Sequence, residues 1–338
     1  MTSQHQDIAD DSLSFVNYVA YIDQLLNFPL FVVSLFMIVM SVFTVPNCLA
    51  RYYCASIAVP GLVASTLDIT IWLIELFAKD LWCYMSLIRT FTDIYVFIRA
   101  YSMQAYLYFS TLTIFLAYMG FAKPVEFQKL ITGRYLFYWF LGGYIWGFVM
   151  TIAAHAHLIL IDTLNFFSEK HNFSVLLIIQ TVLSLAMYWF MLVFYVLTLI
   201  KIRGAKTGSQ KNSWNVLKSV LIYCTPPNMF VAAAISGYVC EDIIELQGLY
   251  QISKWPSYEA WSEWIYNGDN CSHIRVWSQA ATNVRLLFTL FTAFIAFREY
   301  RVGLSAIVKK ALKKIRILKS RFSKDCIIST TVSVLSRH

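Results

Sequence analysis

The sequence predicts an all-α polytopic membrane protein, a bundle of seven transmembrane helices followed by a C-terminal amphipathic surface helix. Seven long apolar segments are the first observation, and each is long enough to cross a hydrocarbon core of about 30 Å. The composition is the second, because 59% of the residues are hydrophobic and only 14% are charged, against about 25% charged in soluble domains. The segments are Phe28–Ala50, Ile57–Ala78, Phe91–Tyr118, Leu136–Ile161, Ser174–Ile200, Val216–Val239 and Val276–Phe297.

The distribution of charge is the third observation, and it predicts the orientation. An odd number of spans places the two ends of the chain on opposite sides. With the N-terminus outside, the inner segments hold a large excess of Lys and Arg and the outer segments are acidic, as the positive-inside rule requires. We therefore expect an extracellular segment at 1–27, a membrane domain at 28–300 and a basic cytoplasmic tail at 301–338, in the plasma membrane.

The tail contains a segment with the pattern of an amphipathic helix. Between Val302 and Phe322, apolar residues recur at helical spacing with Lys and Arg between them, which is typical of a helix lying on an anionic leaflet. Anionic inner-leaflet lipids are thus an expected partner. The net charge of +8 gives no reason to expect nucleic acid, because no soluble domain remains outside the spans.

Three cysteines fall on the predicted outer side, where disulfides can form. Cys240 and Cys271 bracket the longest outer loop, so we expect a bridge between them. A bridge from Cys83 to either one is the alternative. Two sequons on this side, at Asn172 and Asn270, are possible glycosylation sites, although both lie close to a membrane boundary.

Polar side chains inside the spans are the candidates for function, because such groups are costly in a bilayer. Their depth suggests that Asp68 pairs with Arg285, and that Glu75 or Asp93 pairs with Arg99. They could be structural bridges or could line an outward ligand cavity, and a cavity needs paired charges too. The ligand-pocket candidates are Glu75, Asp93, Arg99, His155 and Gln279, and the buried polar core candidates are Asn47, Asp68, Asn283 and Arg285.

Catalytic and metal motifs are not expected. His155 and His157 are two residues apart and face different sides of a helix, and no organised third ligand accompanies them. The sequence contains no phosphate-binding glycine loop and no nucleophile elbow. We expect no enzyme, no metal and no cofactor.

Two consecutive prolines, Pro226 and Pro227, lie inside the sixth expected span. They remove two backbone donors and force a kink. A kink of this kind is either a hinge for a conformational signal or a static bend.

The seven-span layout and the proline kink resemble G-protein-coupled receptors, although Ala117-Tyr118-Met119 stands in place of their Asp-Arg-Tyr motif. The Tyr223–Asn228 stretch, Tyr-Cys-Thr-Pro-Pro-Asn, and the closing Phe297–Arg301 stretch, Phe-Arg-Glu-Tyr-Arg, are similar to nematode serpentine chemoreceptors, most of all class BC.

That resemblance implies a chemosensory receptor that binds an external small molecule and signals to a heterotrimeric G protein. The inner surface that would contact the transducer includes Lys123, Pro124, Lys201 and Arg203. The alternatives are a ligand-gated channel of the insect odorant-receptor type, which has its N-terminus inside, and a small transporter, which usually has two related halves.

Overall fold

The structure is a computed structural model, and every regular element that it describes is a helix. It describes residues 2–46, 48–77, 84–131, 134–164, 170–204, 227–237, 239–240, 243, 269–310 and 312–315. The helices are α1 (Thr2–Phe43), α2 (Leu49–Phe77), α3 (Tyr84–Ala122), α4 (Pro124–Ile131), α5 (Arg134–Leu164), α6 (Lys170–Gly204) and α9 (Asp269–Ala296). A further helical stretch covers residues 227–237, and Arg298–Ile315, here called the C-terminal helix, follows α9.

Five of the described helices are long and apolar enough to cross a membrane. Their candidate spans are Tyr21–Phe43, Leu49–Phe77, Ser86–Ala122, Arg134–His155 and Leu176–Lys201. A sixth is added if Ala280–Ala296 and the C-terminal helix are taken together as one broken span. The expectation of an all-α polytopic membrane protein is confirmed. The expected sixth span, Val216–Val239, lies largely outside the described residues, so the structure shows five or six spans where the sequence predicts seven.

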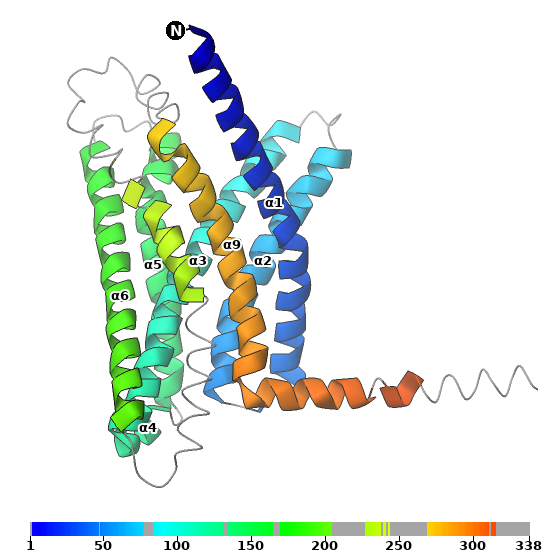
Figure 1. The fold of residues 1–338 in the computed structure, drawn as a ribbon, viewed down its shortest axis with the longest axis vertical. Helices are drawn as coiled ribbons and strands as arrows, with labels where there is room; N and C mark the ends of the chain where they lie inside the picture. Colours follow the sequence, from blue (N-terminus) through cyan, green and yellow to red (C-terminus); the bar gives the residue numbers. More distant parts are fainter. Residues whose placement is uncertain are drawn as a thin grey trace, which may run out of the picture.

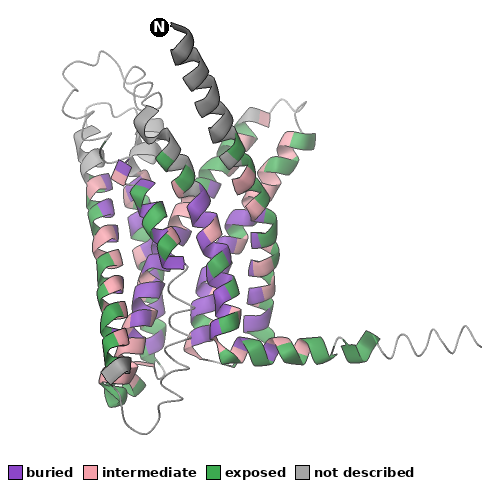
Figure 2. Ribbon diagram, in the orientation of Figure 1, coloured by how far each residue is buried: buried purple, intermediate pink, exposed green. Residues whose placement is uncertain are grey.

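Helices α1, α2, α3, α5 and α6 run in alternating directions, and α9 runs in the same direction as α6 (Figure 1). The N-terminus and the C-terminal helix lie at opposite ends of the bundle. Helix α1 packs against α2 and α9, and α3 packs against α2, α5 and α6. Because α3 has three neighbours, much of its length is buried, including Met103, Leu107 and Phe109 (Figure 2). It forms the centre of the bundle.

Residues 227–237 lie between α6 and α9. The Tyr188 hydroxyl of α6 donates a hydrogen bond to the backbone carbonyl of Asn228 at 3.4 Å. On the other side, Phe230 stacks on Phe288 of α9 with ring centroids 5.2 Å apart, and the Ser278 hydroxyl donates to the Ala234 carbonyl at 2.8 Å. This stretch therefore runs antiparallel to α9 and closes the bundle.

Glycines allow α5 to approach α3 closely, as small residues do in membrane bundles. A Cβ atom added at Gly143 would lie 2.3 Å from Cε1 of Phe109, which is fully buried, and one at Gly147 would lie 3.2 Å from Cβ of Ala105. Any side chain at Gly143 would have to displace the Phe109 ring.

The C-terminal helix turns away from α9 by 84° and lies across the end of the bundle (Figure 1). Tyr300 anchors it, because this side chain is fully buried and its hydroxyl lies 2.6 Å from that of Ser41 in α1. The Arg301 guanidinium donates to the Ile295 carbonyl at 2.6 Å, which satisfies a backbone group left free where α9 ends. The helix expected over Val302–Phe322 is described as far as Ile315 and begins four residues earlier than expected, at Arg298. Residues 316–322 of that expectation lie outside the described part of the chain.

Candidate functional site

An ion pair between α1 and α3 is the centre of a polar network inside the bundle. Nη1 of Arg99 lies 2.9 Å from Oδ2 of Asp23, and Nη2 lies 3.3 Å from Oδ1. This paired geometry uses the fixed fork of the guanidinium and is the strongest form of charge-assisted hydrogen bond. Nη1 also donates to the Tyr95 hydroxyl at 2.9 Å, one turn away on α3.

Two asparagines extend the network to α2 and α9. Asn27 donates to the Asp68 carboxylate at 2.7 Å. Asn283 donates to the Asp23 carboxylate at 2.9 Å and to the Asn27 side-chain carbonyl at 3.3 Å. Both asparagine side chains are buried, so their amides are satisfied within the protein, as burial requires. The network joins four helices that are far apart in sequence.

The network residues of α1, α2 and α3 lie within candidate membrane spans, and Asn283 lies within Ala280–Ala296, which forms a candidate span together with the C-terminal helix. Asn283 is about 20 Å along α9 from its first residue, at 1.5 Å per residue. At this depth an isolated charge is costly, and removing one partner of a buried pair leaves the other uncompensated. The pair between Asp23 and Arg99 therefore ties the middle of α1 to α3.

The pairings expected from depth are wrong. Arg99 binds Asp23 rather than Glu75 or Asp93, and Asp68 binds Asn27 rather than Arg285. The cause is the position of α1. Its candidate span is Tyr21–Phe43 instead of Phe28–Ala50, so Asp23 and Asn27, which were expected in the outer segment, lie inside the bundle.

Three other ligand-pocket candidates, Glu75, Asp93 and His155, lie outside this network. Asp93 is exposed and Glu75 is half-buried. Nδ1 of His155 lies 3.0 Å from the Thr151 carbonyl, and its ring packs edge-on against Phe97. The Gln279 side chain lies outside the described residues. The structure thus brings one of the five pocket candidates, Arg99, into the network.

Arg285 is a second buried cation, and it lies on α9 away from Asp68. Its side chain is fully buried, and its guanidinium carbon is 4.2 Å from the centre of the Tyr106 ring, a cation–π geometry. Asn283 belongs to the polar core as expected, although it joins Asp23 and Asn27. Asn47 lies outside the described residues.

The candidate transducer residues lie at the end of the bundle that holds the C-terminal helix. Lys123 is exposed and pairs with Glu126 at 3.3 Å, and Pro124 begins α4. Lys201 is exposed near the end of α6. The side chain of Arg203 is outside the described residues.

The expected hinge is described only in part. Pro226 lies outside the described residues, and Pro227 is buried at the start of the helical stretch 227–237. The choice between hinge and static bend stays open.

Cys240 is disulfide-bonded. Of its two expected partners, Cys83 is outside the described residues, and so is the side chain of Cys271. Cys48 and Cys54, at the opposite end of the bundle, are free thiols. Asn172 and Asn270 fall in the first turns of α6 and α9, and nothing is described of their side chains.

Asp23, Asn27 and Tyr95 complete the network and were not among the sequence candidates. Asp23 and Asn27 are four residues apart just before a long apolar run, which places both on one helix face. Extending the first span by one turn or two would have included them. Among the residues that the structure describes, no group of His, Cys, Asp and Glu could hold a metal ion.

No family model matches the chain, and no curated protein matches it. The helices and their buried polar network define a polytopic α-helical membrane protein with five or six candidate spans.

Proposed function

We propose that this protein is a seven-transmembrane chemosensory receptor, which binds an external small molecule and signals inward through a heterotrimeric G protein, with no catalytic step. The network of Asp23, Asn27, Asp68, Arg99 and Asn283 is the observation that carries the proposal. It ties α1, α2, α3 and α9 together in the half of the bundle nearest the N-terminus. A ligand that interacts differently with two arrangements of such contacts shifts the equilibrium between them.

A seventh crossing is supported by residues 227–237. They are helical, run antiparallel to α9 and contact both α6 and α9. A membrane helix at this place would complete an alternating sequence of seven, with the kink at Pro226 and Pro227 at its inner half.

An outward N-terminus is supported by two independent features. Cys240 is oxidised and lies at the end of the bundle that holds the start of α9 and the N-terminus, whereas the free thiols Cys48 and Cys54 lie at the other end. Disulfides form in oxidising compartments. The basic residues of the C-terminal helix fit a cytoplasmic position at the plasma membrane, in contact with anionic lipids.

The receptor class is supported by the resemblance of the Tyr223–Asn228 and Phe297–Arg301 stretches to serpentine chemoreceptors. A test is nucleotide exchange: purified full-length protein in lipid discs, incubated with G-protein heterotrimers, should accelerate GTP binding when an active compound from a chemical panel is added. Arg99→Gln protein, recovered in folded form, should lose that response. Ion conductance or substrate uptake by the reconstituted protein without any G protein would instead identify a channel or a transporter.

A further inference from the structure

A groove lies between the end of α1 and the C-terminal helix, opposite the polar network. Its volume is about 480 Å³, and it is lined by Phe43, Thr44, Pro46, Arg298, Glu299, Val302, Gly303, Ala306 and Lys310. This volume is in the range of small-molecule sites. The two walls approach closely at Gly303, where an added Cβ would lie 2.9 Å from both Met40 and Thr44.

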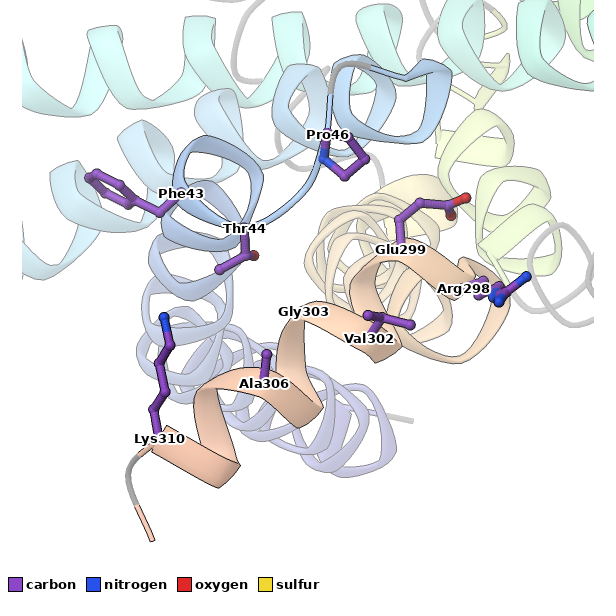
Figure 3. Close-up of a pocket in the computed structure, with 9 residues that line it drawn as sticks. All are labelled: Phe43, Thr44, Pro46, Arg298, Glu299, Val302, Gly303, Ala306 and Lys310. Carbon is purple, nitrogen blue, oxygen red and sulfur yellow. The ribbon is translucent and has the colours of Figure 1, made fainter. Parts of the chain in front are cut away.

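The charges of the groove are separated along its length. The Lys310 side chain extends from the C-terminal helix toward Phe43 and Thr44, whereas Arg298 and Glu299 lie at the other end of that helix (Figure 3). Eleven residues separate Glu299 from Lys310, which is about 16 Å along a helix. The end near Phe43 is therefore basic, and the Glu299 carboxylate is too far away to neutralise it.

The basic end continues directly into an apolar surface. Exposed side chains follow one face of α1 at helical spacing from the middle of the span to the groove, namely Val32, Leu35, Val39, Val42 and Phe43. Phe43 is 79% exposed, so a large apolar ring is available beside the Lys310 ammonium. An ammonium at the end of an apolar helix face fits a molecule that carries an anionic head and long acyl chains.

We propose that this groove is a binding site for one anionic glycerophospholipid, with its phosphate on Lys310 and its acyl chains along the exposed face of α1. This site differs from the general attraction of a basic helix to a charged leaflet, because a single side chain, Lys310, binds the lipid headgroup at a defined place. The lipid would bridge α1 to the C-terminal helix, beside the contact between Ser41 and Tyr300. The site does not require the receptor function, and its test has no signalling readout.

Lys310 and Lys309 form a matched pair for the test. Both are exposed on the C-terminal helix, and only Lys310 lines the groove. Full-length protein in a neutral detergent would be titrated with phosphatidylglycerol or phosphatidylcholine, and native mass spectrometry would count the bound lipids. The first phosphatidylglycerol molecule should bind more tightly than any further phosphatidylglycerol molecules. Lys310→Ala should weaken it by about fivefold, as expected for one basic residue at about 1 kcal/mol, and Lys309→Ala should bind like the parent.

Ala306→Phe is a second variant that leaves the charge unchanged. Ala306 is exposed and lines the groove, so a ring there should fill the groove without disturbing the bundle, and tight binding should be lost. Unchanged melting temperatures of the variants show that the bundle is folded.

Four results would overturn the proposal. Equal weakening by Lys310→Ala and Lys309→Ala leaves only diffuse electrostatic attraction. Equal binding of phosphatidylcholine, which has no net charge, shows that the groove does not recognise an anionic headgroup. Displacement of the lipid by excess inorganic phosphate shows an anion site without acyl-chain recognition. Tight binding that appears only after deletion of residues 316–338 shows that the chain's own tail occupies the groove.

Discussion

The Asp23 carboxylate of α1 and the Arg99 guanidinium of α3 form a two-point ion pair, with contacts of 2.9 and 3.3 Å. The two side chains are only 15% and 13% exposed. They are 76 residues apart in the sequence, and Asn283 brings a third helix to the same carboxylate. The pair, together with Asn283, therefore couples α1 to α3 and to α9.

Breaking this pair should destabilise the bundle. Asp23→Leu leaves the Arg99 charge buried without its carboxylate, which typically costs about 3–5 kcal/mol. We expect a clear drop in the melting temperature of the protein in detergent. The double variant Asp23→Leu with Arg99→Met should be more stable than the sum of the single changes predicts, because it leaves neither charge alone. Asp93→Asn changes an exposed carboxylate on α3, the helix of Arg99, and should have little effect on the melting temperature. Additive losses from the two single variants would show that the side chains do not interact.

Close packing of α5 on α3 gives a second prediction. Gly143→Ala places a methyl group 2.3 Å from the buried Phe109 ring, and such overpacking typically costs about 1–3 kcal/mol. Gly120→Ala is the matched control, because its Cβ would lie 3.6 Å from the Phe127 ring, an ordinary contact. Both changes favour the helix intrinsically by about 1 kcal/mol. Gly143→Ala should lower the melting temperature and Gly120→Ala should leave it unchanged or raise it. Equal effects would mean that α3 and α5 are not in close contact at Gly143.

Tyr300 should hold the C-terminal helix against α1. Tyr300→Phe removes one hydrogen bond to Ser41 and should cost about 1 kcal/mol, whereas Ser41 keeps its bond to the Met37 carbonyl. Tyr300→Ala also removes a fully buried ring, at a cost nearer 3–5 kcal/mol. Limited trypsin digestion should then cleave after Lys309 and Lys310 much faster in Tyr300→Ala than in Tyr300→Phe or the parent. Equal cleavage rates in all three proteins would contradict the anchoring role.

The orientation can be tested with Cys240 and two epitopes. On intact cells, an N-terminal epitope should be stained without permeabilisation and a C-terminal epitope only after it. A maleimide that cannot cross membranes should label Cys240 only after reduction, because the residue is disulfide-bonded. The reverse staining pattern would place the N-terminus inside and would refute the receptor proposal together with the orientation.

The membrane helices could be predicted from the sequence because crossing a bilayer depends on local composition. An uninterrupted apolar run must form a helix there, since no water satisfies the backbone. The amphipathic pattern that begins at Val302 is also a local property of the sequence, and it predicted the C-terminal helix. The end of an apolar run predicts the boundary of a membrane span less well than its centre predicts the span itself. Asp23 and Asn27 are polar, so the first span was expected to begin after them, and the structure begins it at Tyr21.

The sequence by itself determined the class of protein, its helical content and the polar side chains that must be satisfied within the membrane. Tertiary structure alone decided which partner satisfies each of them. Glu75 and Asp93 were the two partners expected for Arg99 from depth, and only the packing of α1 in the bundle brings Asp23 to it. Tyr300 and Ser41 are also brought together only by the packing of the helices, since they lie 259 residues apart in the sequence. Spacing along a helix fixes the face that a side chain occupies, and the neighbour on that face depends on how the helices pack.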